Sequence, residues 1–347
     1  SATPSVESYH LAVNNRYKLV ELKVRYGDVQ LPEVLVLDRQ DAFVKNRMKA
    51  MFSWLLIEKM NECLANGEQV ILFQNRRGFS SFVECKQCAW VPKCPHCDVS
   101  LTYHKFQNYL SCHYCGHRAP VPTSCPKCGH EEIKDKGFGT EKVMEELAER
   151  FPDYKAGRLD LDVATSKHAY EKIFNAFSSG EIKILVGTQM VAKGLDFDNV
   201  GLVGVLNADN MLNYPDFRSD ERAFQLLLQV AGRAGRRNKR GLVLVQTAQT
   251  EHAVIPAIIN NDYSYFYNKQ VMLRQMFSYP PFVRIIDIYV KANDYTLCSR
   301  AVGALHKELE RSFGDQLLGP DKPPVSKVQK MHIQKLMLKL PIGQSMV

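Results

Sequence analysis

The spacing of apolar residues along the chain predicts alternating helices and strands. A helical pattern over residues 47–64 gathers apolar side chains on one face, and an apolar run at 70–73 predicts the strand that follows it. Later segments repeat this alternation, with helices expected at 141–150, 167–177 and 220–230 and strands at 182–186, 201–206 and 242–246. Strands that alternate with helices are typical of an α/β fold, in which a parallel sheet has helices on both faces.

The two ends of the chain have a different character. Residues 1–40 have a polar start and short strand-like runs at 18–24 and 34–37, which indicates a connector. Beyond Gln246 come a tyrosine-rich helical stretch at 253–277, a strand at 284–291, a helix at 295–313 and a final run at 325–340, which together predict a small α+β domain. The expected organisation is a connector at 1–40, an α/β lobe at 41–84 and 131–250, an insertion at 85–130, and a C-terminal domain at 251–347.

The insertion is defined by its cysteines. Eight of the ten cysteines form four CxxC pairs: Cys85 and Cys88, Cys94 and Cys97, Cys112 and Cys115, Cys125 and Cys128. Two such pairs can complete a tetrahedral site with four thiolate ligands, so four pairs predict two zinc ions. Four protein ligands leave no open position for water, so both sites are expected to be structural. The segment has few large apolar residues, and metal binding would replace the core that it lacks.

Other interpretations of these cysteines remain open. The pairs could form disulfides, or one pair could be redox-active, but four regular pairs in a chain without a secretion signal favour metal. Spacing alone does not fix the pairing. We prefer a nested arrangement, in which Cys85, Cys88, Cys125 and Cys128 hold one ion and Cys94, Cys97, Cys112 and Cys115 hold the other, over a sequential one. Because the cysteines fill both sites, we interpret the histidines at 96, 104, 113 and 117 as surface residues or as neighbours of the ligands, not as ligands.

The charge of the chain is moderately basic, at a formal +8. Each four-thiolate zinc site would carry a formal charge of −2, which lowers the total to about +4. Binding to nucleic acid must therefore depend on local basic patches. No apolar run approaches the roughly 18 residues that a membrane span needs, so we expect a soluble, cytoplasmic protein without membrane contact.

Two glycine-containing segments carry further chemistry. The run GTQMVAKGLDF begins at Gly187, where an apolar strand ends, and such ends are where α/β sheets place ligands. The run QVAGRAGR, from Gln229 to Arg236, carries two arginines among small residues, where guanidinium groups can approach a polyphosphate closely. A glycine-rich helix end with solvent-facing arginines is the alternative, which the nearby strand-end segment makes less attractive.

These segments together resemble a known family. QVAGRAGR looks like motif VI of superfamily 2 helicases, and GTQMVAKGLDF looks like their motif V. The stretches ADNMLNYPDFRSDERAFQLLLQ and GFGTEKVMEEL, with four CxxC pairs after NRRGFS, resemble the primosomal protein N′ family of replication-restart DNA helicases. Even the first residues, SATPS, look like its motif III. The resemblance covers essentially the whole chain and implies a RecA-like second helicase lobe.

The resemblance also implies roles for single residues. Arg236 would be the arginine finger that stabilises charge on the transferring phosphoryl group, with Arg233 near the γ-phosphate and Gln229 coupling the cleft to motion. Gly194 and Asp196 would line the nucleotide cleft, while Thr188 and Gln189 would connect it to the DNA groove. ATP and Mg²⁺ would be bound by the complete protein, a 3′-to-5′ helicase that restarts stalled replication forks and initiates primosome assembly.

Some parts of such a motor are absent from this sequence. It contains no GxxxxGK[ST] phosphate loop, and the run DERA at Asp220 opens a helix instead of following a strand. We expect the phosphate loop and acidic box upstream of Ser1, and no ATP hydrolysis by this chain alone. The competing hypothesis is a non-enzymatic zinc module that binds DNA or protein.

The expected partners follow from the family. They are forked or single-stranded DNA, primosome proteins and single-strand-binding proteins, and the chain itself is expected to be a monomer. Five lysines crowd the end of the C-terminal domain, at positions 322, 327, 330, 335 and 339, and we nominate Lys327 and Lys330 as DNA contacts. Lysines on a solvated edge strand, which need no ligand, are the alternative.

Overall fold

The computed structural model describes residues 1–22, 31–74, 82–85, 87–88, 90–97, 99–104, 108–112, 114–135, 139–160, 167–192, 197–213, 216–235 and 240–343. Its contacts divide the chain into two compact units. The larger unit comprises Ser1–Phe79 and Phe138–Val271, and the smaller unit comprises Ser80–Gly137 and Met272–Val347. The cysteine-rich insertion therefore groups with the C-terminal domain. The segment boundaries expected from the sequence remain predictions.

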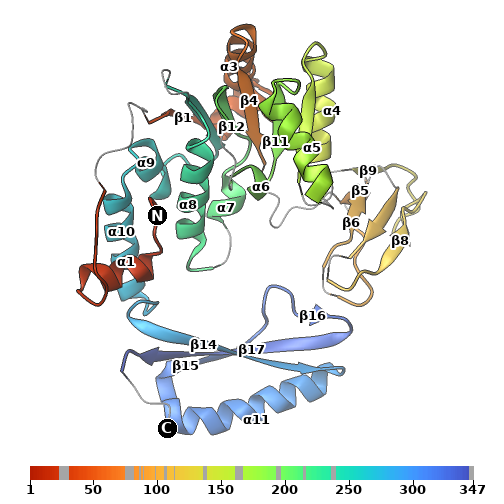
Figure 1. Ribbon diagram of the computed structural model, residues 1–347. Helices are drawn as coiled ribbons and strands as arrows, with labels where there is room; N and C mark the ends of the chain where they lie inside the picture. The colour runs from red at the N-terminus through yellow and green to blue at the C-terminus, as the bar shows by residue number, and fades with distance from the viewer. Residues whose placement is uncertain are drawn as a thin grey trace. The chain divides into compact units, whose positions relative to one another are not determined.

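The larger unit is built on one parallel sheet of six strands (Figure 1). The strand order is β1-β13-β12-β4-β11-β10, and every neighbouring pair is parallel. The bounds are β1 Glu33–Asp38, β4 Gln69–Phe73, β10 Ala156–Leu159, β11 Ile184–Gly187, β12 Val200–Val205 and β13 Leu242–Thr247. The expected parallel sheet is confirmed. Strand β10 was not predicted, because Ala-Gly-Arg-Leu contains no apolar run.

Helices cover both faces of this sheet. Phe73, Val203 and Val245 pack on one face with side chains of α5, α8 and α9, while Leu72, Leu202 and Leu244 pack on the other with α3 and α4. Adjacent residues of a strand thus enter opposite cores, which explains the continuous apolar runs. The helices are α2 Arg39–Val44, α3 Trp54–Ala65, α4 Thr140–Arg150, α5 Lys167–Ser178, α6 Gln189–Ala192, α7 Asp209–Leu212, α8 Ser219–Ala231, α9 Val254–Ile259 and α10 Tyr263–Met276.

The helix expected at 47–64 begins later than predicted. Strands β2 (Met48–Lys49) and β3 (Phe52–Ser53) form a short antiparallel pair, and α3 begins at Trp54. The side chain of Ser53 accepts a hydrogen bond from the Leu56 N–H at 3.2 Å and so caps the helix. Met51 and Phe52, which the pattern assigned to the apolar face of the helix, are buried, but they reach the core from the hairpin. Apolar spacing alone missed the capping serine.

The N-terminal segment contains a helix that was not predicted, α1 (Val6–Val13). Ser5 caps it, and Tyr9 packs edge-on against Tyr263 and Tyr267 with ring centroids 5.1 and 4.7 Å apart. The strand expected at 18–24 is wrong for residues 18–22, and the remainder lies outside the described residues. The helix expected at 253–277 is two helices, α9 and α10, because Asn261 adopts a positive φ between them.

The smaller unit contains the insertion and the C-terminal domain. Short strands build the insertion: β5 (Val83–Cys85) pairs with β9 (Ile133–Asp135), and β6 (Thr102–His104), β7 (Tyr109–Ser111) and β8 (Arg118–Pro120) form a three-stranded sheet. In the C-terminal domain, helix α11 (Tyr295–Phe313) packs on a sheet of β14 (Val283–Ala292), β15 (Leu317–Asp321), β16 (Lys327–Val328) and β17 (Met331–Pro341). The expected α+β domain is confirmed.

Candidate metal centres and motor segments

The eight paired cysteines form two groups in the insertion. One group, here site 1, contains Cys85, Cys88, Cys125 and Cys128, and the other, site 2, contains Cys94, Cys97, Cys112 and Cys115. Within each group all four sulfur atoms lie within 4.8 Å of one another. Closest sulfur pairs are 3.6 Å apart in both groups. A zinc ion with four sulfurs at about 2.3 Å gives sulfur–sulfur distances of about 3.8 Å, so both groups fit zinc.

The local backbone explains how each pair turns toward a common point. In site 2 the N–H of Cys112 donates to the carbonyl of His117, and in site 1 the N–H of Cys125 donates to the carbonyl of His130, each at 2.8 Å. Gly116 and Gly129 follow the second cysteine of these pairs with φ values of 72° and 75°. Glycine adopts such positive φ values without a steric penalty, so each closes its turn.

The thiols respond differently to their surroundings. A hydrogen bond from the Cys88 backbone N–H lowers the pKa of the Cys85 thiol to about 6. Burial raises the pKa of the Cys97 thiol to about 12. A divalent cation binds the deprotonated form and would hold both groups as thiolates.

The insertion has only a small apolar core. Its buried members are Val83, Leu101 and Leu110, together with three site 2 cysteines, Cys94, Cys97 and Cys112. The metal ligands thus form about half of the core. This agrees with the expectation that metal binding replaces apolar packing in this segment.

Site 2 also contacts the C-terminal domain within the smaller unit. The backbone N–H of Gln329 donates to the Cys97 sulfur at 3.2 Å, and that of Lys330 donates to the His96 carbonyl at 2.7 Å. Val328 packs against the core of the insertion. Gln329 and Lys330 form the two-residue turn between β16 and β17, both with positive φ, as hairpin turns of this length require.

The histidines and aromatic residues of the insertion are partly described. The rings of His96 and His117 lie edge-on at 5.0 Å, and no histidine belongs to either sulfur group among the described residues. Tyr109 lies under the Arg118 guanidinium at 4.8 Å, whereas Tyr114 is exposed. His113 and Phe106 lie outside the described residues.

The two glycine-containing segments, here called the motor segments, lie along the sheet of the larger unit: the first begins at the carboxyl end of β11, and the second reaches the amino end of β12 at Gly235. Thr188 directly follows β11 at its carboxyl end, where its N–H donates to the Leu159 carbonyl at 3.4 Å. Gln189 begins α6 beside it. Because β11 and β12 run parallel, the chain between them must cross from the side of the sheet at which the strands end, here called the carboxyl edge, to the side at which they begin, here called the amino edge. Thr188 is 7% exposed and Gln189 is half-buried.

The arginine segment lies at the amino edge. Helix α8 carries the chain to this edge, and the Gly235 N–H donates to the carbonyl of Val200, the first residue of β12, at 2.9 Å. Any side chain at Gly241 would collide with the Gly235 nitrogen, 2.2 Å from an added Cβ. Arg233 is half-buried here, and Gln229 is exposed on α8. Arg236, Gly194 and Asp196 lie outside the described residues.

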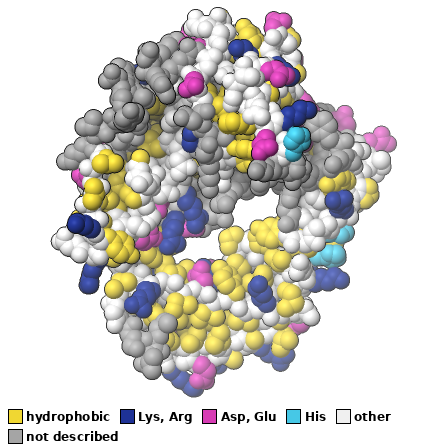
Figure 2. Space-filling view, viewed as in Figure 1, with side chains coloured by type: hydrophobic (Ala, Val, Ile, Leu, Met, Phe, Trp, Pro, Cys, Tyr) yellow, Lys and Arg dark blue, Asp and Glu magenta, His cyan; other side chains and the backbone are white. Residues whose placement is uncertain are grey.

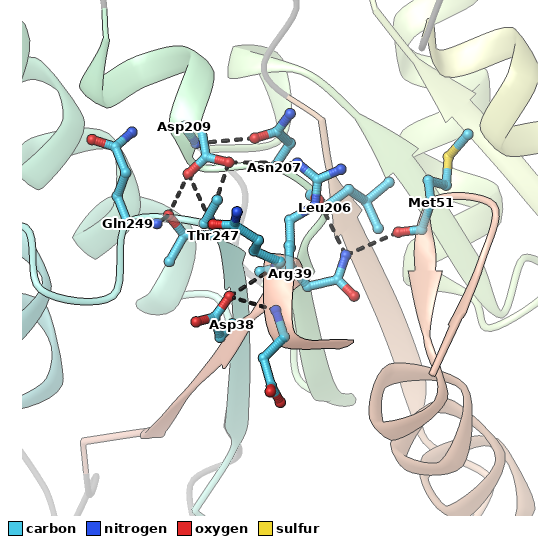
Figure 3. A network of polar contacts seen from close by, with 12 residues as sticks. Asp38, Arg39, Met51, Leu206, Asn207, Asp209, Thr247 and Gln249 are labelled. Carbon is cyan, nitrogen blue, oxygen red and sulfur yellow. Dashed lines mark hydrogen bonds and ion pairs between the residues drawn. The ribbon is translucent and has the colours of Figure 1, made fainter. Parts of the chain in front are cut away.

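The sequence did not predict a polar network at the carboxyl edge (Figure 3). Asp209 accepts hydrogen bonds from the Thr247 hydroxyl and from the Ala248 N–H at 3.0 Å, and it pairs with Arg39 at 3.5 Å. Asp209 and Arg39 follow β12 and β1, and Thr247 is the last residue of β13. Their position at or after the ends of apolar strands was the available signal, but no motif brought them together.

Gln246 joins this edge to the hairpin that precedes α3. It is fully buried, donates to the carbonyls of Met51 and Leu206 at 3.0 and 3.1 Å, and accepts from the Ser53 N–H at 2.9 Å. All three bonds hold elements of one fold together. Its role is therefore structural.

The five C-terminal lysines differ in their contacts. Lys335 pairs with Asp287 at 2.9 Å, and Lys339 donates to the Phe277 carbonyl at 2.8 Å, where burial lowers the pKa of the Lys339 ammonium group. Lys327 is half-buried and Lys330 is exposed, and neither has an ion pair among the described residues. On the face drawn in Figure 2, Lys and Arg side chains lie dispersed among other kinds.

Two protein-family profiles match this chain. The profile of the PriA DNA helicase Cys-rich region domain matches residues 94–120, which contain site 2. The profile of the helicase conserved C-terminal domain matches residues 135–238, which contain both motor segments. The fold of the larger unit is thus that of a helicase C-terminal lobe. None of the helices in the described ranges has the length and apolar character to cross a membrane.

Several curated proteins are similar along nearly the whole chain. Replication restart protein PriA of Bacillus subtilis is 43% identical over 98% of the chain, and those of Synechocystis and Haemophilus influenzae are 38% and 37% identical over 98%. The chain covers 42%, 42% and 46% of these relatives. It therefore spans less than half of their length.

Proposed function

This chain is homologous to the replication restart proteins PriA along nearly its whole length, and from this relationship we propose that it is part of an ATP-dependent 3′-to-5′ DNA helicase that restarts stalled replication forks. In that protein the larger unit would contain most of the second motor lobe. The observation that carries the proposal is the helicase C-terminal domain match across residues 135–238, in which Gly235, two residues after Arg233, is hydrogen-bonded to the start of β12. The complete protein would hydrolyse ATP, and this chain alone would not.

The distance along the strands between Thr188 and Gln189 at the carboxyl edge and the arginine segment at the amino edge supports distinct roles. Arg233 and Arg236 would stabilise negative charge on the phosphates of ATP bound at the amino edge, with Gly194 and Asp196 near them. Thr188 and Gln189, at the carboxyl edge, would contact the DNA backbone. Gln229 would transmit closure of the ATP cleft through α8. One sheet would thus couple nucleotide binding to DNA movement, while the ATP site and the DNA site would use different residues at its two edges.

The metal content belongs to the same proposal. Site 1 and site 2 would each hold one structural Zn²⁺ in the nested arrangement, which the sulfur distances support. ATP and Mg²⁺ would bind at an interface with a first motor lobe, which supplies the phosphate loop. The metal ions would give the insertion its fold and take no part in hydrolysis.

The partners would be forked and single-stranded DNA, primosome proteins and single-strand-binding proteins, with the helicase acting as a monomer. Residues 1–40 would connect the two lobes, 41–84 and 131–250 would form the second lobe, 85–130 the zinc insertion and 251–347 the DNA-binding C-terminal domain. Lys327 and Lys330 would contact phosphates, because neither is engaged by a carboxylate among the described residues.

DNA-stimulated ATP hydrolysis by the complete protein tests the arginine role. Arg236→Ala should lower turnover by about 10³-fold or more while leaving DNA affinity unchanged, as arginine fingers contribute that much. Arg240→Ala is the matched control, because Arg240 is exposed and its Nε donates to the Leu31 carbonyl at 2.9 Å. Equal turnover by both variants would refute the arginine-finger role. DNA binding indifferent to ATP in the complete wild type would favour the non-enzymatic zinc module.

A further inference from the structure

A pocket of about 480 Å³ lies in the smaller unit where the insertion meets the C-terminal domain. Lys93, Cys94 and Cys97 of the insertion form one wall, and residues of α11, β17 and the segment around β16 form the other. Its volume falls within the roughly 300–1,000 Å³ of small-molecule sites. We call it the seam pocket.

Cationic side chains dominate the seam pocket. Lys93 comes from the insertion, and Lys322 and Lys327 come from the C-terminal domain. No carboxylate lines the pocket among the described residues, and none of the three lysines has an ion pair there. A zinc-loaded site 2, with a formal charge of −2, offsets part of the charge of the three ammonium groups, and the net positive charge that remains favours an anionic ligand.

Aromatic rings complete the lining. Tyr295 is 46% exposed, and its ring lies edge-on to His332 with centroids 5.7 Å apart. The Lys322 ammonium group lies 5.3 Å from the centroid of the Tyr295 ring. A half-exposed ring beside ammonium groups is the arrangement that binds a nucleotide of a single strand, with the base on the ring and the phosphates on the cations.

The two walls are held together by backbone contacts. The Gln329 and Lys330 N–H groups donate to the Cys97 sulfur and the His96 carbonyl, as described above. Cys94 and Cys97 also line the pocket, so the zinc ligand set and the pocket share two residues. A pocket with fixed walls loses little conformational entropy when it binds a ligand.

We infer that the seam pocket binds the backbone and one base of single-stranded DNA, with Lys93, Lys322 and Lys327 on consecutive phosphates and Tyr295 under the base. The lysines alone indicate that the ligand is an anion, whereas its identification as DNA rests on the proposed function. The insertion and the C-terminal domain thereby form one binding surface, and neither supplies the site by itself.

The test measures binding of a fluorescein-labelled oligothymidylate to the zinc-loaded chain by anisotropy at several salt concentrations. Lys93→Gln and Lys322→Gln should each weaken binding about three- to fivefold near 0.15 M salt and reduce the slope of log K against log salt by about 0.7. Lys307→Gln, at an exposed position of α11 outside the pocket, should change neither. Tyr295→Ala should weaken binding about tenfold without changing the slope, and Tyr295→Phe should restore it.

Each outcome separates the pocket from the helicase proposal. Wild-type binding that Lys93→Gln, Lys322→Gln and Tyr295→Ala all leave unchanged would refute the seam pocket and leave the helicase proposal standing. Failure of the wild type to bind the oligonucleotide would remove DNA as the ligand. Thymidine monophosphate should not displace the oligonucleotide at millimolar concentration. Displacement that the pocket variants abolish would assign the pocket to free nucleotides and overturn the inference.

Discussion

The two four-cysteine groups have the same ligands and different surroundings. Site 1 lies beside the β5–β9 pair, where the insertion begins and ends, and its Cys128 is exposed. Site 2 has three buried cysteines within the apolar core of the insertion, and it accepts a backbone hydrogen bond from the C-terminal hairpin. Identical metal chemistry can therefore close the base of an insertion in one place and hold a second domain in another.

Removal of both metal ions should have the largest effect. A chelator should unfold residues 82–135, because structural zinc contributes roughly 10–16 kcal/mol of apparent binding free energy to such segments. Hydrogen exchange should show loss of protection in β5 to β9, while β4, β11 and β12 of the larger unit stay protected. Added zinc should restore the exchange pattern. An insertion that stays protected without zinc would contradict the metal-built core.

A substitution in one site at a time should separate the two. Cys112→Ser should speed amide exchange at Gln329 and Lys330 by tenfold or more, because it disorders the group that contains Cys97. Cys125→Ser, the matched control in site 1, should leave these two amides protected. Exchange measured residue by residue gives the comparison. Equal exchange rates at these two amides in both variants would show that the two sites act as one and would contradict the difference between their surroundings.

The smallest effects are expected at the two turn glycines. Gly116→Ala and Gly129→Ala each force alanine to a positive φ, and nothing lies within 4 Å of the added Cβ. The cost should be about 1–2 kcal/mol for each, measured as zinc affinity in competition with a metal-binding dye. Gly116→Asn should lose less, because asparagine tolerates this region. Unequal losses of zinc affinity at the two sites would show that the two turns differ in more than their backbone conformation.

The sequence predicted what local patterns can encode. Four CxxC pairs indicate two metal sites because ligand spacing is a local property, and the apolar runs at β4, β11, β12 and β13 indicate a parallel sheet because burial on both faces leaves a continuous signal. The bounds of α11 were predicted to the residue. Strand β10 and helix α1 were missed, since the first is short and weakly apolar and the second depends on a serine cap.

Contacts between distant segments could not be predicted in this way. The Gln329 N–H donates to the Cys97 sulfur, although the two residues are 232 positions apart in the sequence. A backbone N–H donor does not depend on the residue type, so no sequence pattern indicates this contact. The network of Arg39, Asp209 and Thr247 likewise forms only when the parallel strands bring their carboxyl ends together. Thr188 and Arg233 lie at opposite ends of the strands only because the strands of this sheet run parallel.

ATP-driven strand separation is the most direct test of the proposed function. The complete protein should be given a fork with a fluorescent displaced strand, and product should be followed with ATP, without ATP, and with the Arg233→Ala variant. The account predicts separation in the 3′-to-5′ direction that requires ATP and is lost in the variant, while DNA affinity is kept. Fork binding by the wild type with no separation in the presence of ATP and Mg²⁺ would contradict it.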